Sequence, residues 1–222
     1  MKKLLLLTLV AILGAGQISA QEPKLRKGYF NLNYAAQQMS ANYEGLEFKY
    51  PKSKIGAGFT VGRTFFLHKE PLAGLVRIGL DATFFDLNWA QYDFEGLNDD
   101  GEGTVEIEIG THQLEAAVGI GPSVTISPVK RLNIQGYFRF MPSYSLLYQD
   151  ETLFGNFGAF FATGGSVSFG AIGVGAEARF GSCKYKNIKS ADDFDKETSS
   201  MPDEDMGKLK TNGMRVYLTF RF

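Results

Sequence analysis

The sequence predicts an all-β fold, an eight-stranded antiparallel up-and-down β-barrel that crosses a membrane. Three observations lead to this prediction. Apolar residues recur at every second position in eight segments, which is the period of a strand with two unlike faces. The connections between these segments are mostly short on one side and long on the other. An export signal at the amino terminus occurs together with an alternating aromatic segment at the carboxyl terminus.

Residues 1–20 have the organisation of a cleaved secretory signal peptide. Lys2 and Lys3 give a positive start, residues 4–13 are apolar except for one threonine, and small residues at 18–20 precede Gln21. The apolar run is shorter than the roughly 20 residues that a membrane-spanning helix needs. No cysteine follows the cleavage point directly, so a lipid anchor is not expected. We therefore expect a mature chain, residues 21–222, that forms one barrel domain.

The composition excludes several classes of protein. Without Lys2 and Lys3, 21 basic residues face 24 acidic ones, and this balance gives no reason to expect a nucleic-acid partner. The single cysteine, Cys183, excludes an intrachain disulfide framework. No segment of the mature chain has the roughly 20 continuous apolar residues that a spanning helix needs.

The first four strands are expected near residues 30–36, 55–62, 76–84 and 114–121. In the third, the apolar set is Val76, Ile78, Leu80, Ala82 and Phe84, and it alternates with Arg77, Gly79, Asp81 and Thr83. The alternation changes parity between residues 105–109 and Leu114. A β-bulge near Gly110 would return the apolar residues to a single face.

The last four strands are expected near residues 132–140, 157–169, 172–181 and 214–222. The sixth has the weakest alternation. The eighth is the most regular, because Met214, Val216, Leu218, Phe220 and Phe222 alternate with Arg215, Tyr217, Thr219 and Arg221. Its closing residue is expected to pair with the first strand, so that the sheet has no free edge in lipid.

Alternation alone does not say which face of the strands is outside. A soluble barrel of the lipocalin kind turns its apolar face inward, and a membrane barrel turns it outward. The less apolar faces are mostly Gly, Ala, Thr, Asn and Gln, which suit a narrow lumen better than a water-exposed surface. The connections agree with a membrane barrel: residues 37–53, 90–104 and 186–212 are long, 67–74, 127–131 and 168–171 are short, and 147–155 is intermediate.

The carboxyl-terminal segment VYLTFRF looks like the signal that outer-membrane barrels present to their insertion machinery, with Val216, Leu218, Phe220 and Phe222 as its residues. The mature chain as a whole resembles the OmpX/OmpW and OmpA-barrel group of small Gram-negative outer-membrane proteins. The resemblance implies residence in the cell outer membrane, contact with its lipid and lipopolysaccharide, and a monomer. The resemblance indicates no extracellular partner. It also says very little about function, because barrels of this group have many different roles.

Seven charged residues are expected to share a few levels of the lumen: Arg77, Asp81, Glu115, Arg139, Glu177, Arg179 and Arg215. They could form a charged gate or a small-ion site. They could equally form a salt-bridged plug, which we favour because the interior of an eight-stranded barrel is just filled by side chains.

The sequence predicts no catalytic residue, no cofactor and no bound metal. Outer-membrane deacylases of the PagL type pair a histidine with a serine two residues on, whereas His112 is followed at that distance by Leu114. Carboxylates cluster in residues 93–108 and 192–205. They could hold Ca²⁺ or Mg²⁺, but their spacing does not match the EF-hand loop, and solvated loops are expected. An exposed strand at 105–109 that pairs with a partner strand is a further alternative.

Three functions follow from these observations. We favour a non-enzymatic barrel with a structural or surface-interaction role and a plugged lumen. The first alternative is a small pore or transporter for small solutes, and the second is a lipid-modifying outer-membrane enzyme.

Overall fold

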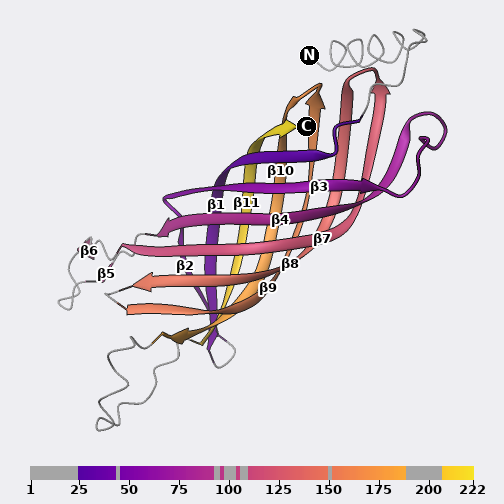
Figure 1. Cartoon of the computed structure of the whole chain (residues 1–222). Coiled ribbons are helices and arrows are strands. Elements are labelled where there is room, and N and C mark those ends of the chain that lie inside the picture. The colour runs from indigo at the N-terminus through magenta and orange to yellow at the C-terminus, as the bar shows by residue number, and fades with distance from the viewer. Residues whose placement is uncertain are drawn as a thin grey trace.

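The computed structural model describes residues 25–43, 46–92, 96–97, 104–105, 110–149, 152–188 and 207–222. The expected signal peptide lies outside these residues. Within them, eight long antiparallel strands form a closed ring (Figure 1). In ring order they are β1 (Gly28–Tyr43), β3 (Ile55–Phe66), β4 (Val76–Tyr92), β7 (Thr111–Val129), β8 (Leu132–Gln149), β9 (Thr152–Phe169), β10 (Ile172–Asn187) and β11 (Gly207–Arg221). The predicted fold class is confirmed.

The ring closes between its first and last strands. β1 pairs with β11 from Tyr29↔Arg221 to Ala41↔Leu209. Beyond that ladder, the Gly28 N–H donates to the Phe222 carbonyl (2.8 Å) and the Phe222 N–H donates to the Gly28 carbonyl (3.0 Å). Closure matters because an unpaired backbone group in hydrocarbon costs several kcal/mol. The final residue therefore completes the hydrogen bonding of the sheet.

The short connections lie at the end of the barrel where the described chain begins and ends. Only residues 130–131 separate β7 from β8, and only 170–171 separate β9 from β10. Gly170 has φ = 66°, which a glycine adopts at no steric cost. We take this end as periplasmic, because short periplasmic turns and longer extracellular loops are the rule in outer-membrane barrels.

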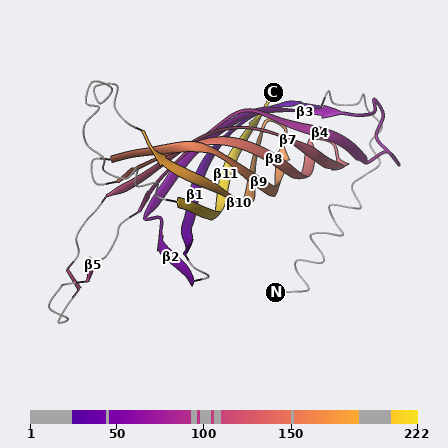
Figure 2. The same ribbon diagram turned by 90° about the horizontal axis from the view of Figure 1, so that it is seen from below.

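The extracellular end contains more strand than the sequence predicted. Residues 37–53 were expected to be a loop, but β1 continues to Tyr43 and β2 (Leu46–Lys52) returns beside it. β8 and β9 are likewise joined by two residues only, where an intermediate connection was expected. Two-residue strands β5 (Gly96–Leu97) and β6 (Thr104–Val105) pair with each other, and β5 lies beyond the rim of the barrel (Figure 2). Strand pairing depends on backbone hydrogen bonds, so it continues beyond the apolar segments that define the prediction.

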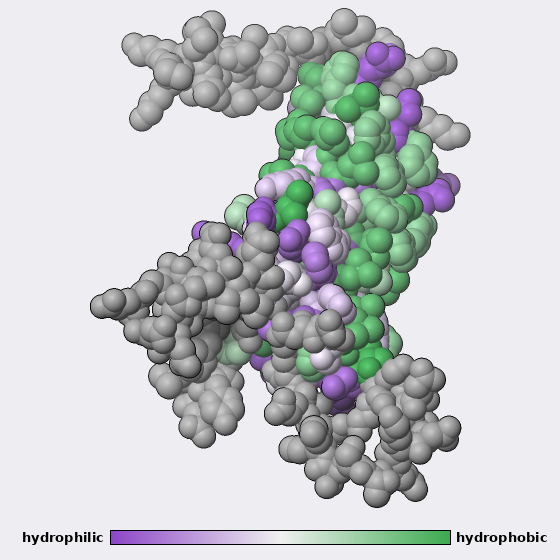
Figure 3. Space-filling model, turned by 90° about the vertical axis from the view of Figure 1, so that its left-hand side faces the viewer, coloured by the Kyte–Doolittle hydropathy of each residue, from purple (hydrophilic) through white to green (hydrophobic). Residues whose placement is uncertain are grey.

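The apolar side chains point outward. Among those that the sequence assigned to the outer face, Ile120 is 51 % exposed, Val174 58 % and Leu218 49 %, whereas the inward Thr125 and Arg215 are each 2 % exposed. Hydrophobic residues cover much of the barrel wall in a band, with hydrophilic residues mainly at its borders (Figure 3). An apolar surface of this extent is typical of a membrane-facing wall.

The described residues include no helix that is long and apolar enough to cross a membrane.

One irregularity in β4 changes which residues face the lumen. Phe84 and Phe85 are adjacent, yet both are exposed on the outer wall, and the register with β7 shifts between Thr83 and Asp86. This β-bulge turns Asp86 inward. The bulge predicted near Gly110 falls at the edge of residues 106–109, which lie outside the described ranges.

Bulky inward rings are accommodated by glycines on the neighbouring strand. The pairs, which face each other directly in the ladder, are Tyr29–Gly62, Tyr137–Gly164, Phe160–Gly181 and Tyr217–Gly175. A Cβ on Gly175 would lie 2.3 Å from the Tyr217 ring, and one on Gly62 would lie 2.2 Å from the Tyr29 hydroxyl. The abundant glycine in these strands thus makes room for aromatic rings inside a narrow barrel.

Leu80→Arg tests the assignment of the outer face. Leu80 is exposed on the outer wall of β4, four residues beyond the first residue of the strand, and an arginine on the lipid-facing wall of barrel hosts costs up to about 2–4 kcal/mol. We expect a loss of that size in urea unfolding from lipid vesicles. The control is Leu67→Arg in the connection after β3, where the cost should be about 0–1 kcal/mol. Equal losses for both variants would contradict the assignment.

Gly175→Ala tests the pairing of glycine with tyrosine. The new methyl group would push Tyr217 from its position, and overpacking of this kind costs about 1–3 kcal/mol. Gly136→Ala is the matched control, because a Cβ there would meet no atom closer than 4.0 Å. Thermal unfolding in detergent should show a lower midpoint for the first variant and an unchanged or higher midpoint for the second.

Candidate functional site

A continuous ladder of alternating acids and arginines crosses the lumen. Its members are, in order, Asp81, Arg139, Glu177, Arg215, Asp86, Arg179 and Glu115. The nitrogen–oxygen distances along it are 2.7, 3.2, 2.9, 3.0, 3.5 and 2.9 Å. All seven side chains are buried, and each of the five inner members contacts two partners of opposite charge.

Hydroxyl groups of neutral side chains donate further hydrogen bonds to the carboxylates of Asp81 and Asp86. Asp81 accepts hydrogen bonds from the hydroxyls of Tyr29 and Thr64, both at 2.8 Å. Asp86 accepts one from the Thr60 hydroxyl at 2.7 Å. Removing a carboxylate from water costs several kcal/mol, and such additional hydrogen bonds are what makes a buried ion pair tolerable.

Aromatic rings cover two of the arginines. The Arg139 guanidinium carbon lies 3.6 Å from the centroid of the Tyr137 ring, and that of Arg179 lies 4.6 Å from the Phe160 ring. These contacts are attractive, because the face of an aromatic ring is electron-rich. They also fill the space beside the ladder.

The buried charge of the lumen is balanced. The fourth buried arginine is Arg221, whose guanidinium donates to the Gln135 side-chain oxygen, while the Gln135 amide donates to Asp81 at 3.2 Å. In the described residues the buried charged side chains are therefore four acids and four arginines. A neutral sum avoids leaving an uncompensated charge in a low-dielectric interior.

Six of the seven residues predicted for the lumen lie in this ladder. The seventh, Arg77, is half-buried nearer the periplasmic end, where its guanidinium carbon lies 6.0 Å from the Phe66 ring centroid. Sequence reasoning missed Asp86, the acid that joins Arg215 to Arg179. The Phe84–Phe85 doublet was the available signal, because two adjacent outward aromatics require the parity of the strand to change.

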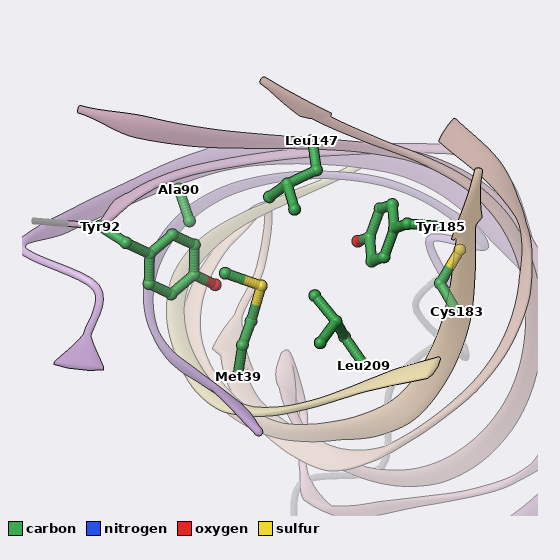
Figure 4. Packing of buried hydrophobic residues seen from close by; sticks show 7 residues of the cluster. All are labelled: Met39, Ala90, Tyr92, Leu147, Cys183, Tyr185 and Leu209. Atoms are coloured by element: carbon green, nitrogen blue, oxygen red, sulfur yellow. The ribbon is translucent and has the colours of Figure 1, made fainter. Parts of the chain in front are cut away.

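An apolar collar lies on the extracellular side of the ladder. It consists of Met39, Ala90, Tyr92, Leu147, Cys183, Tyr185 and Leu209. Their side chains point into the barrel from several strands (Figure 4). Gln113 joins the two tyrosines across the collar, accepting from Tyr92 and donating to the Tyr185 hydroxyl, each at 2.8 Å. Cys183 is a buried, packed member of the collar.

Neither histidine lies in a catalytic arrangement. The His112 ring stacks on Trp89 at the outer wall, with centroids 5.9 Å apart. His68 lies in a periplasmic connection, where a ring nitrogen is hydrogen-bonded to the Glu70 carbonyl. In the described ranges, no group of three His, Cys, Asp or Glu side chains has the arrangement of a metal site.

The predicted insertion-signal residues all lie on the outer wall of β11 and at its end. Val216 is 56 % exposed, Leu218 49 %, Phe220 38 % and Phe222 66 %. The Phe222 ring lies over Gly28, because a Cβ on that glycine would be 2.4 Å from the ring. The signal residues are thus displayed on one face, at the periplasmic edge of the apolar band.

Comparison with known proteins finds similarity of structure only. No family model matches the sequence. No curated protein is significantly similar to it. Ail, the attachment invasion locus protein of Yersinia pestis, matches over 89 % of this chain and 100 % of its own at 11 % identity and a TM-score of 0.41. Neisserial surface protein A covers 87 % and 97 % at 10 % identity and 0.42. The outer membrane protease OmpT from Escherichia coli covers 93 % and 99 % at 10 % identity and 0.48. These values are too low to transfer any role to this chain.

The closed ring, the apolar wall and the filled lumen define the class of protein. It is a small eight-stranded up-and-down β-barrel with an apolar outer wall, which is the architecture of a transmembrane barrel.

Arg139→Met tests the ladder. The substitution leaves Asp81 without its ion pair in the ladder, and breaking a buried pair in this way costs about 3–5 kcal/mol. Urea unfolding in lipid vesicles should show a loss of that size. Arg139→Met combined with Asp81→Asn should recover part of it, because the unpaired charge is removed. Additive losses would mean that the two residues are not energetically coupled.

Deletion of Phe222 separates an anchoring role from a recognition role. As an anchor, the ring contributes at most about 1.5–3 kcal/mol, so the barrel should lose some stability in every setting. As part of an insertion signal, we expect assembly in cells to fail while refolding in detergent stays nearly normal. Heat-modifiable migration on a denaturing gel measures assembly, and urea unfolding measures stability. Normal assembly in cells together with unchanged stability would exclude both roles.

Proposed function

We propose that this protein is a non-enzymatic outer-membrane barrel with a closed lumen and a structural or surface-interaction role. The observation that carries the proposal is the contact between Asp86 on β4 and Arg179 on β10, at 3.5 Å. These strands are four apart in a ring of eight, so they lie on opposite walls. Side chains that meet across the full width of the lumen leave little room for a solute.

The collar supports the same proposal. It places a second barrier in series with the ladder, and the two differ in character: one is apolar and the other is charged. An ion that passes would have to shed water at the collar and then displace paired charges at the ladder. Both steps are unfavourable in a low-dielectric interior.

A closed lumen leaves the extracellular end as the part available to partners. There β2 pairs with the end of β1, and the β5–β6 pair lies outside the ring (Figure 1). A non-enzymatic role agrees with the two histidines, one stacked on Trp89 and the other bonded to backbone. Lipid A mass spectra from cells with and without the protein test the enzymatic alternative, which requires a modified species that depends on the protein.

One observation favours the pore as a second candidate. In the described residues, the side-chain hydroxyls of Thr111, Ser123 and Thr125 are buried without a protein hydrogen-bond partner. Buried polar atoms of this kind commonly bind ordered water. A file of water beside the ladder would give small solutes a route that the charged side chains do not fill.

Single-channel recording distinguishes the closed barrel from the pore. The wild-type barrel in a planar bilayer should show no steady conductance, whereas Arg139→Ala combined with Arg179→Ala should leak, because two of the three ladder arginines are lost. Arg77→Ala, outside the ladder, is the control and should stay silent. Steady conductance of the wild type would overturn the proposal in favour of a pore.

A further inference from the structure

Exposed basic residues follow one half of the rim at the periplasmic end of the barrel. Arg26 and Lys27 precede β1, Lys69 lies in the connection from β3 to β4, and Lys130 and Arg131 form the turn between β7 and β8. β1 and β8 are four apart in the ring of eight, so these residues reach from one wall to the opposite wall by way of β4. We call Arg26, Lys27, Lys69, Lys130 and Arg131 the basic arc.

Few acids lie near the basic arc, at an end of the barrel that the structure describes from Leu25 onward. The internal segments outside the described ranges all join strands at the extracellular end. Among the described periplasmic residues, negative charge comes from Glu70 and from the terminal carboxylate of Phe222. Residues 21–24, which precede the described chain, contain one acid and one lysine, and these cancel. The arc therefore keeps a net positive charge.

The turn residues of the arc lie beyond the apolar band of the wall. At that side of the barrel the last ladder partners are Leu132↔Phe169 and Phe169↔Ile172. Phe169 and Ile172 are 63 % and 59 % exposed on the outer wall, as expected for residues at the membrane boundary. Lys130 and Arg131 lie past this level, at the tip of the turn. Their charges therefore face the aqueous periplasm, where a partner would have to be dissolved or suspended.

The backbone of Arg131 indicates that its side chain has a use. Arg131 has φ = 74°, in the left-handed region, which is unfavourable for a residue with a Cβ. The neighbouring β9–β10 turn has Gly170 in this region, at φ = 66°, and the Gly170 N–H donates to the Arg131 carbonyl (2.8 Å). Glycine would thus be the more stable choice at position 131 as well. A strained residue at an exposed site is a reason to look for a function of its side chain.

The length of the basic arc indicates the shape of its ligand. From β1 to β8 the rim crosses four strand spacings of about 4.8 Å, which a tilt of about 40° widens to about 6 Å each, or about 25 Å in all. An extended peptide covers this length with about eight residues at about 3.3 Å each. A single phosphate or one lipid headgroup would contact only a small part of it. Length and charge together favour an extended polyanion.

We propose that the basic arc binds an extended acidic peptide segment of a periplasmic partner. The carboxylates of such a segment would pair with the arc in sequence, and the planar fork of Arg131 suits bidentate pairing with one of them. The other half of the rim has the neutral turn Gly170–Ala171 and the terminal carboxylate, so it would not compete for the segment. This interaction lies at the opposite end of the barrel from the surface role proposed above and does not depend on it.

Fluorescence anisotropy with a labelled octaglutamate peptide tests the proposal. The barrel is placed in nanodiscs of phosphatidylcholine, which has no net charge, and octaglutamine is the control peptide. We expect binding of octaglutamate that weakens as salt is added, and no binding of octaglutamine. Lys130→Gln combined with Arg131→Gly should raise the Kd up to about 25-fold, because an exposed ion pair contributes up to about five-fold. Lys184→Gln combined with Lys208→Gln, at the extracellular end, is the matched control and should leave the Kd unchanged.

Arg131→Gly alone separates binding from folding. Glycine adopts the left-handed conformation at no steric cost, so the midpoint of thermal unfolding should rise while the Kd for octaglutamate increases about five-fold. A lower midpoint with an unchanged Kd would overturn the proposal, because it would show that the arginine serves the fold.

Two further results would overturn it. Equal binding of octaglutamate and octaglutamine would show that charge is not recognised. Native mass spectrometry that shows retention of phosphatidylglycerol, lost in the Lys130 and Arg131 variant, together with no binding of octaglutamate, would show that the ligand is a lipid. Heat-modifiable migration confirms in each case that the variant is folded, and none of these results depends on whether the lumen conducts.

Discussion

Closure of the ring is the constraint on which the rest of this structure depends. A sheet in hydrocarbon cannot leave an edge unpaired, so β11 must return to β1, and the chain must supply hydrogen bonds as far as Phe222. Eight strands make a narrow ring, and its interior must be filled by the side chains that alternate inward. The glycines opposite tyrosines are a direct consequence: a ring such as that of Tyr217 fits only because Gly175 has no side chain.

The same narrowness explains the form of the charge ladder. Acids and arginines that point into so small a lumen cannot be solvated separately, and an isolated one would be very costly. Alternation of sign gives each inner member two partners, and hydroxyl groups such as those of Tyr29 and Thr60 saturate the carboxylates. The net energy of such a network is small, because desolvation opposes attraction. Its stronger effect is on register, because a shift of one residue would move every charge in a strand into lipid.

Wall and lumen have opposite requirements, and the strands meet both by period-two alternation alone. Toward the extracellular end, the outer face changes from apolar residues to lysines on β10 and β11, and to aromatic rings on β4, β7 and β8. The inner face changes at a similar level from the charged ladder to the apolar collar. Along each strand, the polarity of the outward side chains and that of the inward side chains thus change independently. The outward side chains match the membrane, and the inward side chains match the packing of the interior.

The sequence by itself determined the fold class, the strand parity and the lumen assignment of Asp81, Glu115, Arg139, Glu177, Arg179 and Arg215. These follow from a local period, which each strand carries within its own residues. Strand ends were less predictable: β1 and β2 extend through residues expected to be a loop, because backbone pairing does not need an apolar pattern. Only the tertiary structure decided which charges meet. The bulge at Phe84–Phe85 turns Asp86 inward, and closure of the ring brings it to Arg179 on the opposite wall. Contacts across a lumen depend on the register of every strand between them, and that register is set by the closed ring as a whole.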